Sequence, residues 1–168
     1  MKDYKALIQK YEVDVYPRRD VTLVKGKGAR LWDDQGNEYI DMAAGISVAN
    51  IGHANDKVVE AISKKASTLI TCPNTFYNDQ KALFLEKLFE VVPKNFTRAF
   101  LTNSGTEAME AAIKFARLNT KKTKFISTMK AFHGRTMGAL SATYKNEYRE
   151  GFGPLVQGFT FVPYNNFE

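Results

Sequence analysis

Residues 99–117 (AFLTNSGTEAMEAAIKFAR) have residue types and spacing that could bind a phosphate group. The apolar start predicts a strand and the alanine-rich remainder predicts a helix, with Ser104, Gly105 and Thr106 in the turn between them. Unpaired backbone N–H groups and the positive end of the helix dipole gather at a helix start. The Gly105 and Thr106 amides, with the Ser104 or Thr106 hydroxyl, could therefore hold a phosphate. The turn lacks the Walker Gly-Lys-Ser/Thr and the repeated glycines of a dinucleotide site.

The same turn could instead be a plain helix cap. Ser104 is followed three residues later by Glu107, the spacing of a capping box. Caps are much commoner than phosphate sites, so this segment alone leaves both interpretations open.

A second turn, residues 131–138 (AFHGRTMG), follows a predicted strand. Ligands in α/β sheets bind at the carboxyl ends of strands. Phe132 could stack on a flat ring and Arg135 offers a planar fork for a carboxylate, with His133 between them. Each side chain alone could be a core aromatic, a loop histidine or a surface charge. Two such turns at strand ends predict one shared cleft.

The elements around these turns alternate between strand and helix. Apolar runs predict strands at 97–101, 124–128 and 159–162, and helical periodicity spans 105–118. This alternation favours an α/β fold with parallel strands. About three strands are fewer than a typical open sheet contains, so we expect an unfinished domain.

The N-terminal half shows a different pattern. Alternating residues and glycine turns at 21–42 predict a β-meander. Residues 56–69, with Asn55 or Asp56 as cap, and residues 78–92 predict amphipathic helices. We place a boundary near Thr75, between a small N-terminal lobe at 1–75 and the first part of a larger α/β domain at 76–168.

Composition narrows the class of protein. The chain is 44% hydrophobic and 25% charged, as in ordinary folded proteins. One cysteine, Cys72, and two histidines exclude an internal disulfide and a Cys/His zinc site, and favour a reducing cytoplasm. We expect no metal, and no export signal or membrane span is visible. The net charge of +6 comes from scattered lysines and is weak evidence for nucleic acid.

Four segments carry a resemblance to a known family. NSGTEA (103–108), FHGRT (132–136), GKGARLWDDQGNEYIDMAAGI (26–46) and IGH (51–53) resemble the class III aminotransferases, in the acetylornithine and ornithine aminotransferase group. The resemblance covers nearly the whole chain. It implies the N-terminal portion of the type I pyridoxal-phosphate fold, made of the small lobe and the start of the large parallel-sheet domain.

The resemblance also implies a cofactor site for pyridoxal 5'-phosphate. Gly105 and Thr106 would bind the phosphate with Ser104 beside it, and Phe132 would cover the pyridine ring next to His133.

Substrate contacts follow from the same resemblance. Arg135 would hold a substrate carboxylate, with Tyr16 and Ile46 as further contacts. Enzymes of the group that act on free ornithine carry tyrosine where this chain has Ile46, which favours an N-acylated substrate. The implied reaction moves the terminal amino group of ornithine or lysine to 2-oxoglutarate.

Residues 131–155 and 163–166 (PYNN) most resemble an archaeal-type branch that serves lysine and arginine biosynthesis. That branch presents its substrate on an acidic amino-group carrier protein, which the +6 charge would complement.

The resemblance places the Schiff-base lysine well beyond residue 168. Lys114 and Lys130 lie in no matching context, so we expect no catalytic residue here and no transamination by this segment alone. The complete protein would be a homodimer. The alternative is a non-catalytic truncated paralogue that serves as a ligand-binding or assembly module.

Overall fold

A computed structural model describes residues 2–166. Its contacts divide the chain into two compact units, one up to Asn78 and one from Asp79 onward, which are described separately. The boundary near Thr75 stays a prediction. No helix in residues 2–166 is both long enough and apolar enough to cross a membrane.

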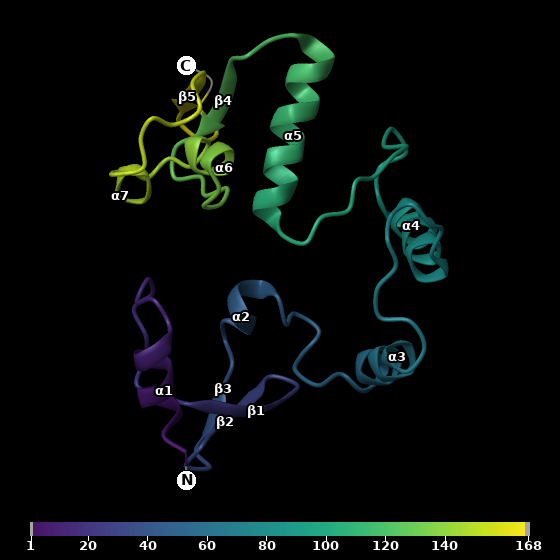
Figure 1. The fold of residues 1–168 in the computed structure, drawn as a ribbon, viewed down its shortest axis with the longest axis vertical. Coiled ribbons are helices and arrows are strands. Elements are labelled where there is room, and N and C mark those ends of the chain that lie inside the picture. Colours follow the sequence, from purple (N-terminus) through teal and green to yellow (C-terminus); the bar gives the residue numbers. More distant parts are fainter. Residues whose placement is uncertain (1, 167–168) are drawn as a thin grey trace. The chain divides into compact units, whose positions relative to one another are not determined.

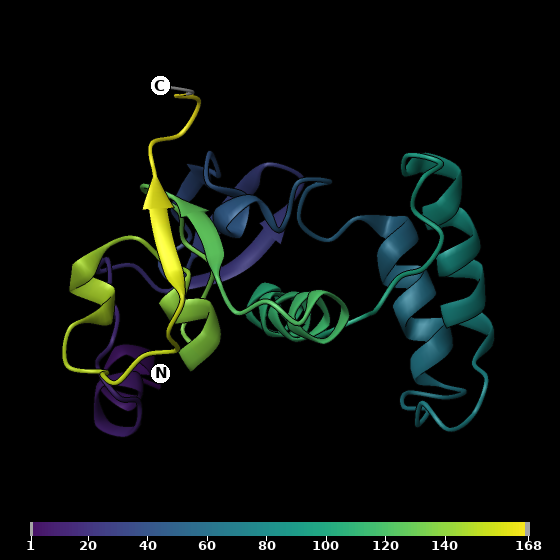
Figure 2. The same cartoon turned by 90° about the horizontal axis from the view of Figure 1, so that it is seen from above.

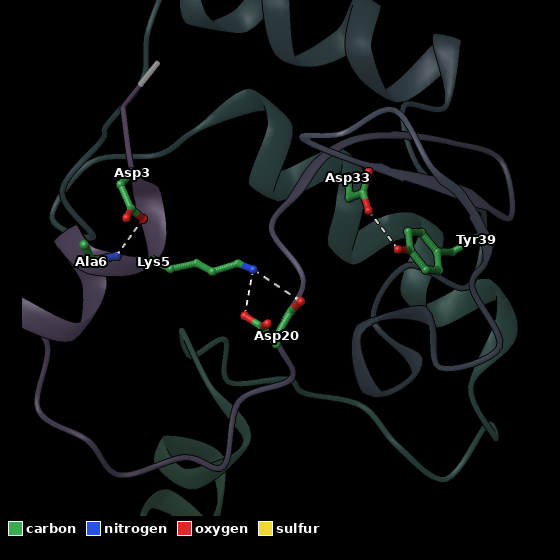
Figure 3. Close-up of polar contacts among 6 residues, drawn as sticks. All are labelled: Asp3, Lys5, Ala6, Asp20, Asp33 and Tyr39. Carbon is green, nitrogen blue, oxygen red and sulfur yellow. Dashed lines mark hydrogen bonds and ion pairs between the residues drawn. The ribbon is translucent and has the colours of Figure 1, made fainter.

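The first unit opens with helix α1 (Tyr4–Tyr11), which the sequence analysis did not predict. The Asp3 side chain caps it by accepting the Ala6 amide hydrogen at 3.0 Å. Lys5 on this helix lies 2.7 Å from the Asp20 carboxylate, so an exposed ion pair joins α1 to the chain before the sheet (Figure 3).

Strands β1 (Leu23–Lys27), β2 (Arg30–Asp33) and β3 (Glu38–Ile40) form an antiparallel sheet in the order β1-β2-β3, which confirms the predicted meander. Buried Asp33 organises the β2–β3 turn by accepting the Asn37 amide hydrogen at 2.8 Å. It also accepts the Tyr39 hydroxyl hydrogen at 2.7 Å (Figure 3). Hydrogen bonds from Asn37 and Tyr39 lower the pKa of Asp33 to about 2 because they stabilise the carboxylate.

The two predicted amphipathic helices are confirmed with small shifts at their ends. Helix α3 spans Asp56–Ala66 and is capped by Asn55, whose side chain accepts the Val58 amide hydrogen. Helix α4 spans Asp79–Val91 in the second unit and ends before Pro93, whose ring cannot continue a helix.

The second unit continues with helices α5 (Gly105–Thr120), α6 (Met137–Ser141) and α7 (Asn146–Arg149), and with strands β4 (Phe125–Thr128) and β5 (Phe159–Val162) (Figure 1). The strands pair in parallel from Phe125–Phe159 to Thr128–Val162 and lie side by side in Figure 2. Parallel pairing across helices confirms the α/β class.

The predicted strand at 97–101 is wrong for this structure. Within the described residues the parallel sheet contains only β4 and β5, so this segment has no ladder partner. It lies against α5 instead, where Phe100 packs edge-on to Phe115 with ring centroids 5.6 Å apart. A strand needs hydrogen bonds from a neighbouring strand, and a local pattern cannot supply that neighbour.

The core of the second unit centres on α6. Ala139, Leu140 and Ala142 are almost fully buried, and α6 packs against α5. The Ser127 hydroxyl on β4 donates to the Ala142 carbonyl at 2.7 Å. Strand, helix and the loop between them therefore form one packed group.

Candidate cofactor site

The turn before α5 forms the cap that the sequence predicts. Ser104 has an extended backbone and its hydroxyl oxygen accepts the Glu107 amide hydrogen at 3.3 Å. The Glu107 carboxylate accepts the Asn103 amide hydrogen at 2.6 Å, one residue earlier than in a standard capping box.

This cap leaves room for an anion. Amides at a helix start have no acceptor within the helix, and Ser104 satisfies only that of Glu107. The Gly105 and Thr106 amides thus remain as donors at the positive end of a 16-residue helix. A β-carbon built at position 105 would meet no atom within 4 Å apart from its chain neighbours and the backbone of its own helix, so the side of the turn that a side chain would occupy is open.

Two hydrogen bonds to residues 143 and 144 hold the loop that follows β4, at residues 131–136. The Tyr144 amide donates to the Ala131 carbonyl at 3.0 Å, and the His133 amide donates to the hydroxyl of Thr143 at the same distance. Thr143 is fully buried. Phe132 keeps 58% of its surface exposed and packs edge-on against Tyr148, so one face of its ring can receive a ligand.

The two turns line one pocket of about 640 Å³. Its described lining consists of Ser104, Gly105, Thr106, Met109, Phe132, His133, Gly134, Arg135 and Thr136. A volume of this size suits a small organic ligand. Anion-binding amides, an aromatic face and a guanidinium are therefore gathered in one cavity.

Ile46 and Tyr16 belong to the first unit, which is described by itself. Ile46 is 93% exposed and lies in α2 (Ala44–Ser47), a short turn that the sequence analysis missed. All four residues of α2 have positive φ, between 47° and 65°, so the turn is left-handed. Such a turn costs roughly 1–2 kcal/mol per non-glycine residue, and hydrophobicity patterns carry no sign of it.

Glu110 and Thr136, which the sequence patterns did not single out, connect the two turns through hydrogen bonds to each other and to Thr106. Thr106 and Glu110 are four residues apart and so share one face of α5, which was a usable signal. The contact of Glu110 with Thr136, 26 positions away in the loop after β4, could not be predicted from residue spacing.

Two solved aminotransferases with this fold contain pyridoxal phosphate. The ornithine aminotransferase of Toxoplasma gondii matches with a TM-score of 0.85 and 31% identity, over 98% of this chain and 40% of that one. The taurine:2-oxoglutarate aminotransferase of Bifidobacterium kashiwanohense was solved with pyridoxal phosphate and glutamate. It matches with a TM-score of 0.87 and 26% identity, over 94% of this chain and 36% of that one. The chain therefore has the N-terminal portion of the type I pyridoxal-phosphate fold.

The chain belongs to the class-III aminotransferase family, whose model matches residues 12–168. The acetylornithine aminotransferase of Methanopyrus kandleri is 52% identical over 98% of this chain, and the [LysW]-aminoadipate semialdehyde transaminase of Deinococcus radiodurans is 45% identical over 95%. The chain spans 42% and 38% of their lengths.

The cofactor is accordingly pyridoxal phosphate, and the pocket fits it. The Gly105 and Thr106 amides belong to the pocket lining and suit the phosphate, and the exposed ring of Phe132 suits the pyridine.

Proposed function

We propose that the complete protein is a cytoplasmic aminotransferase. It transfers the terminal amino group of an N-acylated or carrier-linked ornithine or lysine to 2-oxoglutarate, in arginine or lysine biosynthesis. The observation that carries this proposal is the pocket that joins helix-start amides, Phe132 and Arg135. The activities named for the Methanopyrus and Deinococcus relatives support it.

Each part of the pocket has a role in this proposal. The Gly105 and Thr106 amides bind the phosphate with the Ser104 hydroxyl beside it, Phe132 covers the ring, and His133 lies next to it. The bound cofactor supplies an electron sink for the substrate carbon that loses a proton. Bidentate hydrogen bonds from Arg135 to the substrate carboxylate would orient that carbon.

Residues beyond 168 complete the site in this proposal. Pyridoxal-phosphate chemistry needs a lysine for the covalent bond to the cofactor and an acidic partner for the pyridine nitrogen. We place both in the remaining three fifths that the relatives possess. Residues 1–168 alone then do not transaminate, whereas the complete protein works as a homodimer.

An assay of the complete protein tests the proposal. Each donor would be supplied with 2-oxoglutarate, and the glutamate formed would be measured. The donors are N-acetylornithine, carrier-linked ornithine, carrier-linked lysine, free ornithine and free lysine, where the carrier is an acidic amino-group carrier protein. We expect turnover with at least one acylated or carrier-linked donor and little with free ornithine. Turnover by residues 1–168 alone, or none by the complete protein with any donor, would contradict it.

A further inference from the structure

We propose that Glu110 is a positioning residue for the cofactor phosphate. Acting through Thr136, it turns the Thr106 hydroxyl away from the phosphate and joins the two turns of the pocket. This inference rests on the cofactor site proposed above. It gives a role to Glu110 and Thr136, which are not among the proposed phosphate contacts.

A continuous chain of hydrogen bonds links the turns. The Thr136 hydroxyl donates to Glu110 Oε1 at 2.6 Å, and the Thr106 and Thr136 hydroxyl oxygens are 2.8 Å apart. The same Glu110 oxygen accepts the Gly138 and Ala139 amide hydrogens at 2.9 and 3.2 Å. One half-buried carboxylate on α5 therefore holds both the Thr136 hydroxyl and the first turn of α6.

The direction of each hydrogen bond follows from counting protons. A carboxylate only accepts, so the single hydrogen of the Thr136 hydroxyl goes to Glu110. Thr136 must then accept in its contact with Thr106, which makes the Thr106 hydroxyl the donor. That hydrogen is used within the protein. Thr106 consequently offers the phosphate its backbone amide and not its hydroxyl hydrogen.

Two glycines let this chain form. A β-carbon at position 134 would lie 2.3 Å from the Thr106 hydroxyl oxygen, and one at position 138 would lie 2.4 Å from Glu110 Oε2. Real β-carbon contacts are essentially never under 3.0 Å. The backbone of the second loop thus approaches both side chains as closely as only glycine permits.

A double-mutant cycle in the complete apoprotein tests the inference. Pyridoxal phosphate affinity would be measured by equilibrium dialysis for wild type, Thr106→Val, Thr136→Ala and the double variant. One neutral hydrogen bond is worth about a two- to tenfold change in Kd. We expect each single variant to weaken binding by that factor. The double variant should bind about as tightly as the weaker-binding single variant, because each single substitution already removes the Thr106–Thr136 hydrogen bond.

Further variants separate positioning from general damage. Glu110→Ala should weaken binding at least as much as Thr136→Ala, because it also removes the acceptor of the Gly138 and Ala139 amides. Glu110→Gln keeps an acceptor oxygen and should restore most of the binding. Thr120→Val removes a hydroxyl near the other end of α5, where it contacts Ala116 and Lys122, and should leave Kd unchanged. Binding of pyridoxal, which lacks the phosphate, should respond less than binding of pyridoxal phosphate.

Independent effects would overturn the inference. If Thr106→Val weakens binding while Thr136→Ala does not, or if their factors multiply, the Thr106 hydroxyl serves the phosphate directly. Failure of the wild-type apoprotein to bind pyridoxal phosphate would instead refute the proposed cofactor site, and this inference with it.

Discussion

His53 Nε2 lies 2.7 Å from one carboxylate oxygen of Asp41. The other oxygen accepts the amide hydrogens of Ala43 and Ala44 at 3.0 and 2.8 Å, at the entrance to the left-handed turn α2. The His53 backbone pairs with Gly28 next to the meander. One histidine–carboxylate contact therefore joins the sheet region to the turn that carries Ile46.

Removing this contact should loosen the turn. The hydrogen bond from His53, followed by those from Ala44 and Ala43, lowers the pKa of Asp41. Its ionised form therefore stabilises the fold above the ordinary carboxylate pKa, and that contribution is lost as pH falls through the lowered value. We expect His53→Ala to speed amide hydrogen exchange at 43–47 at neutral pH. An unchanged exchange rate would show that the contact does not hold the turn.

Acid should weaken the meander through Asp33. Its pKa of about 2 lies below the ordinary value of 3.8, so its contribution to stability is complete above pH 3.8 and disappears as pH falls through about 2. Trp32, the single tryptophan, is adjacent and reports unfolding by fluorescence. Between these pH values, Asp33→Asn should reduce the slope of the free energy of unfolding against pH, while Asp34→Asn should leave that slope unchanged. Equal slopes in both variants would contradict the assignment.

Gly134→Ala should weaken pyridoxal phosphate binding by more than the backbone strain of an alanine at this positive φ would cause. The new β-carbon would lie 2.3 Å from the Thr106 hydroxyl oxygen, and overpacking of this kind typically costs about 1–3 kcal/mol. Gly151→Ala is the matched control, because Gly151 also has positive φ but has open space around it. We expect Kd for pyridoxal phosphate to rise about tenfold in the first variant and little in the second. Equal effects would point to backbone strain.

Arg135→Lys should raise KM for carboxylate substrates while leaving cofactor affinity unchanged. Lysine keeps the charge but loses the planar fork, and a hydrogen bond to a charged group is worth about 1.5–3 kcal/mol. We expect roughly a tenfold or larger increase in KM for 2-oxoglutarate in steady-state assays of the complete protein. The exposed Arg98→Lys serves as control. A changed cofactor Kd with unchanged KM would move Arg135 from the substrate to the cofactor.

Ile46→Tyr should shift donor preference toward free ornithine. The side chain is almost fully exposed within its own unit, so the exchange alters the surface with little repacking there. We expect the ratio of kcat/KM for free over acylated ornithine to rise. An unchanged ratio would show that Ile46 does not contribute to donor choice.

The sequence alone determined the elements whose hydrogen bonds and periodicity are local. Helices α3, α4 and α5, the cap at Ser104 and the strand at 159–162 all lie where their patterns predict them. Each depends on residues a few positions apart, which is the range over which propensity and capping act. The two turns were likewise visible as candidates, because glycine, hydroxyl and guanidinium groups follow predicted strands.

Only the tertiary structure decided what these turns do together. The Thr106–Thr136 contact joins residues 30 positions apart, and Glu110 reaches the amides of α6 over 28 and 29 positions. The segment 97–101 fails as a strand because strand formation depends on a neighbour. At the entrance to the left-handed turn at Ile46, the Asp41 carboxylate that accepts the Ala43 and Ala44 amide hydrogens is itself contacted by His53, 12 positions away. Contacts between distant residues are set by packing, and local sequence patterns do not encode them.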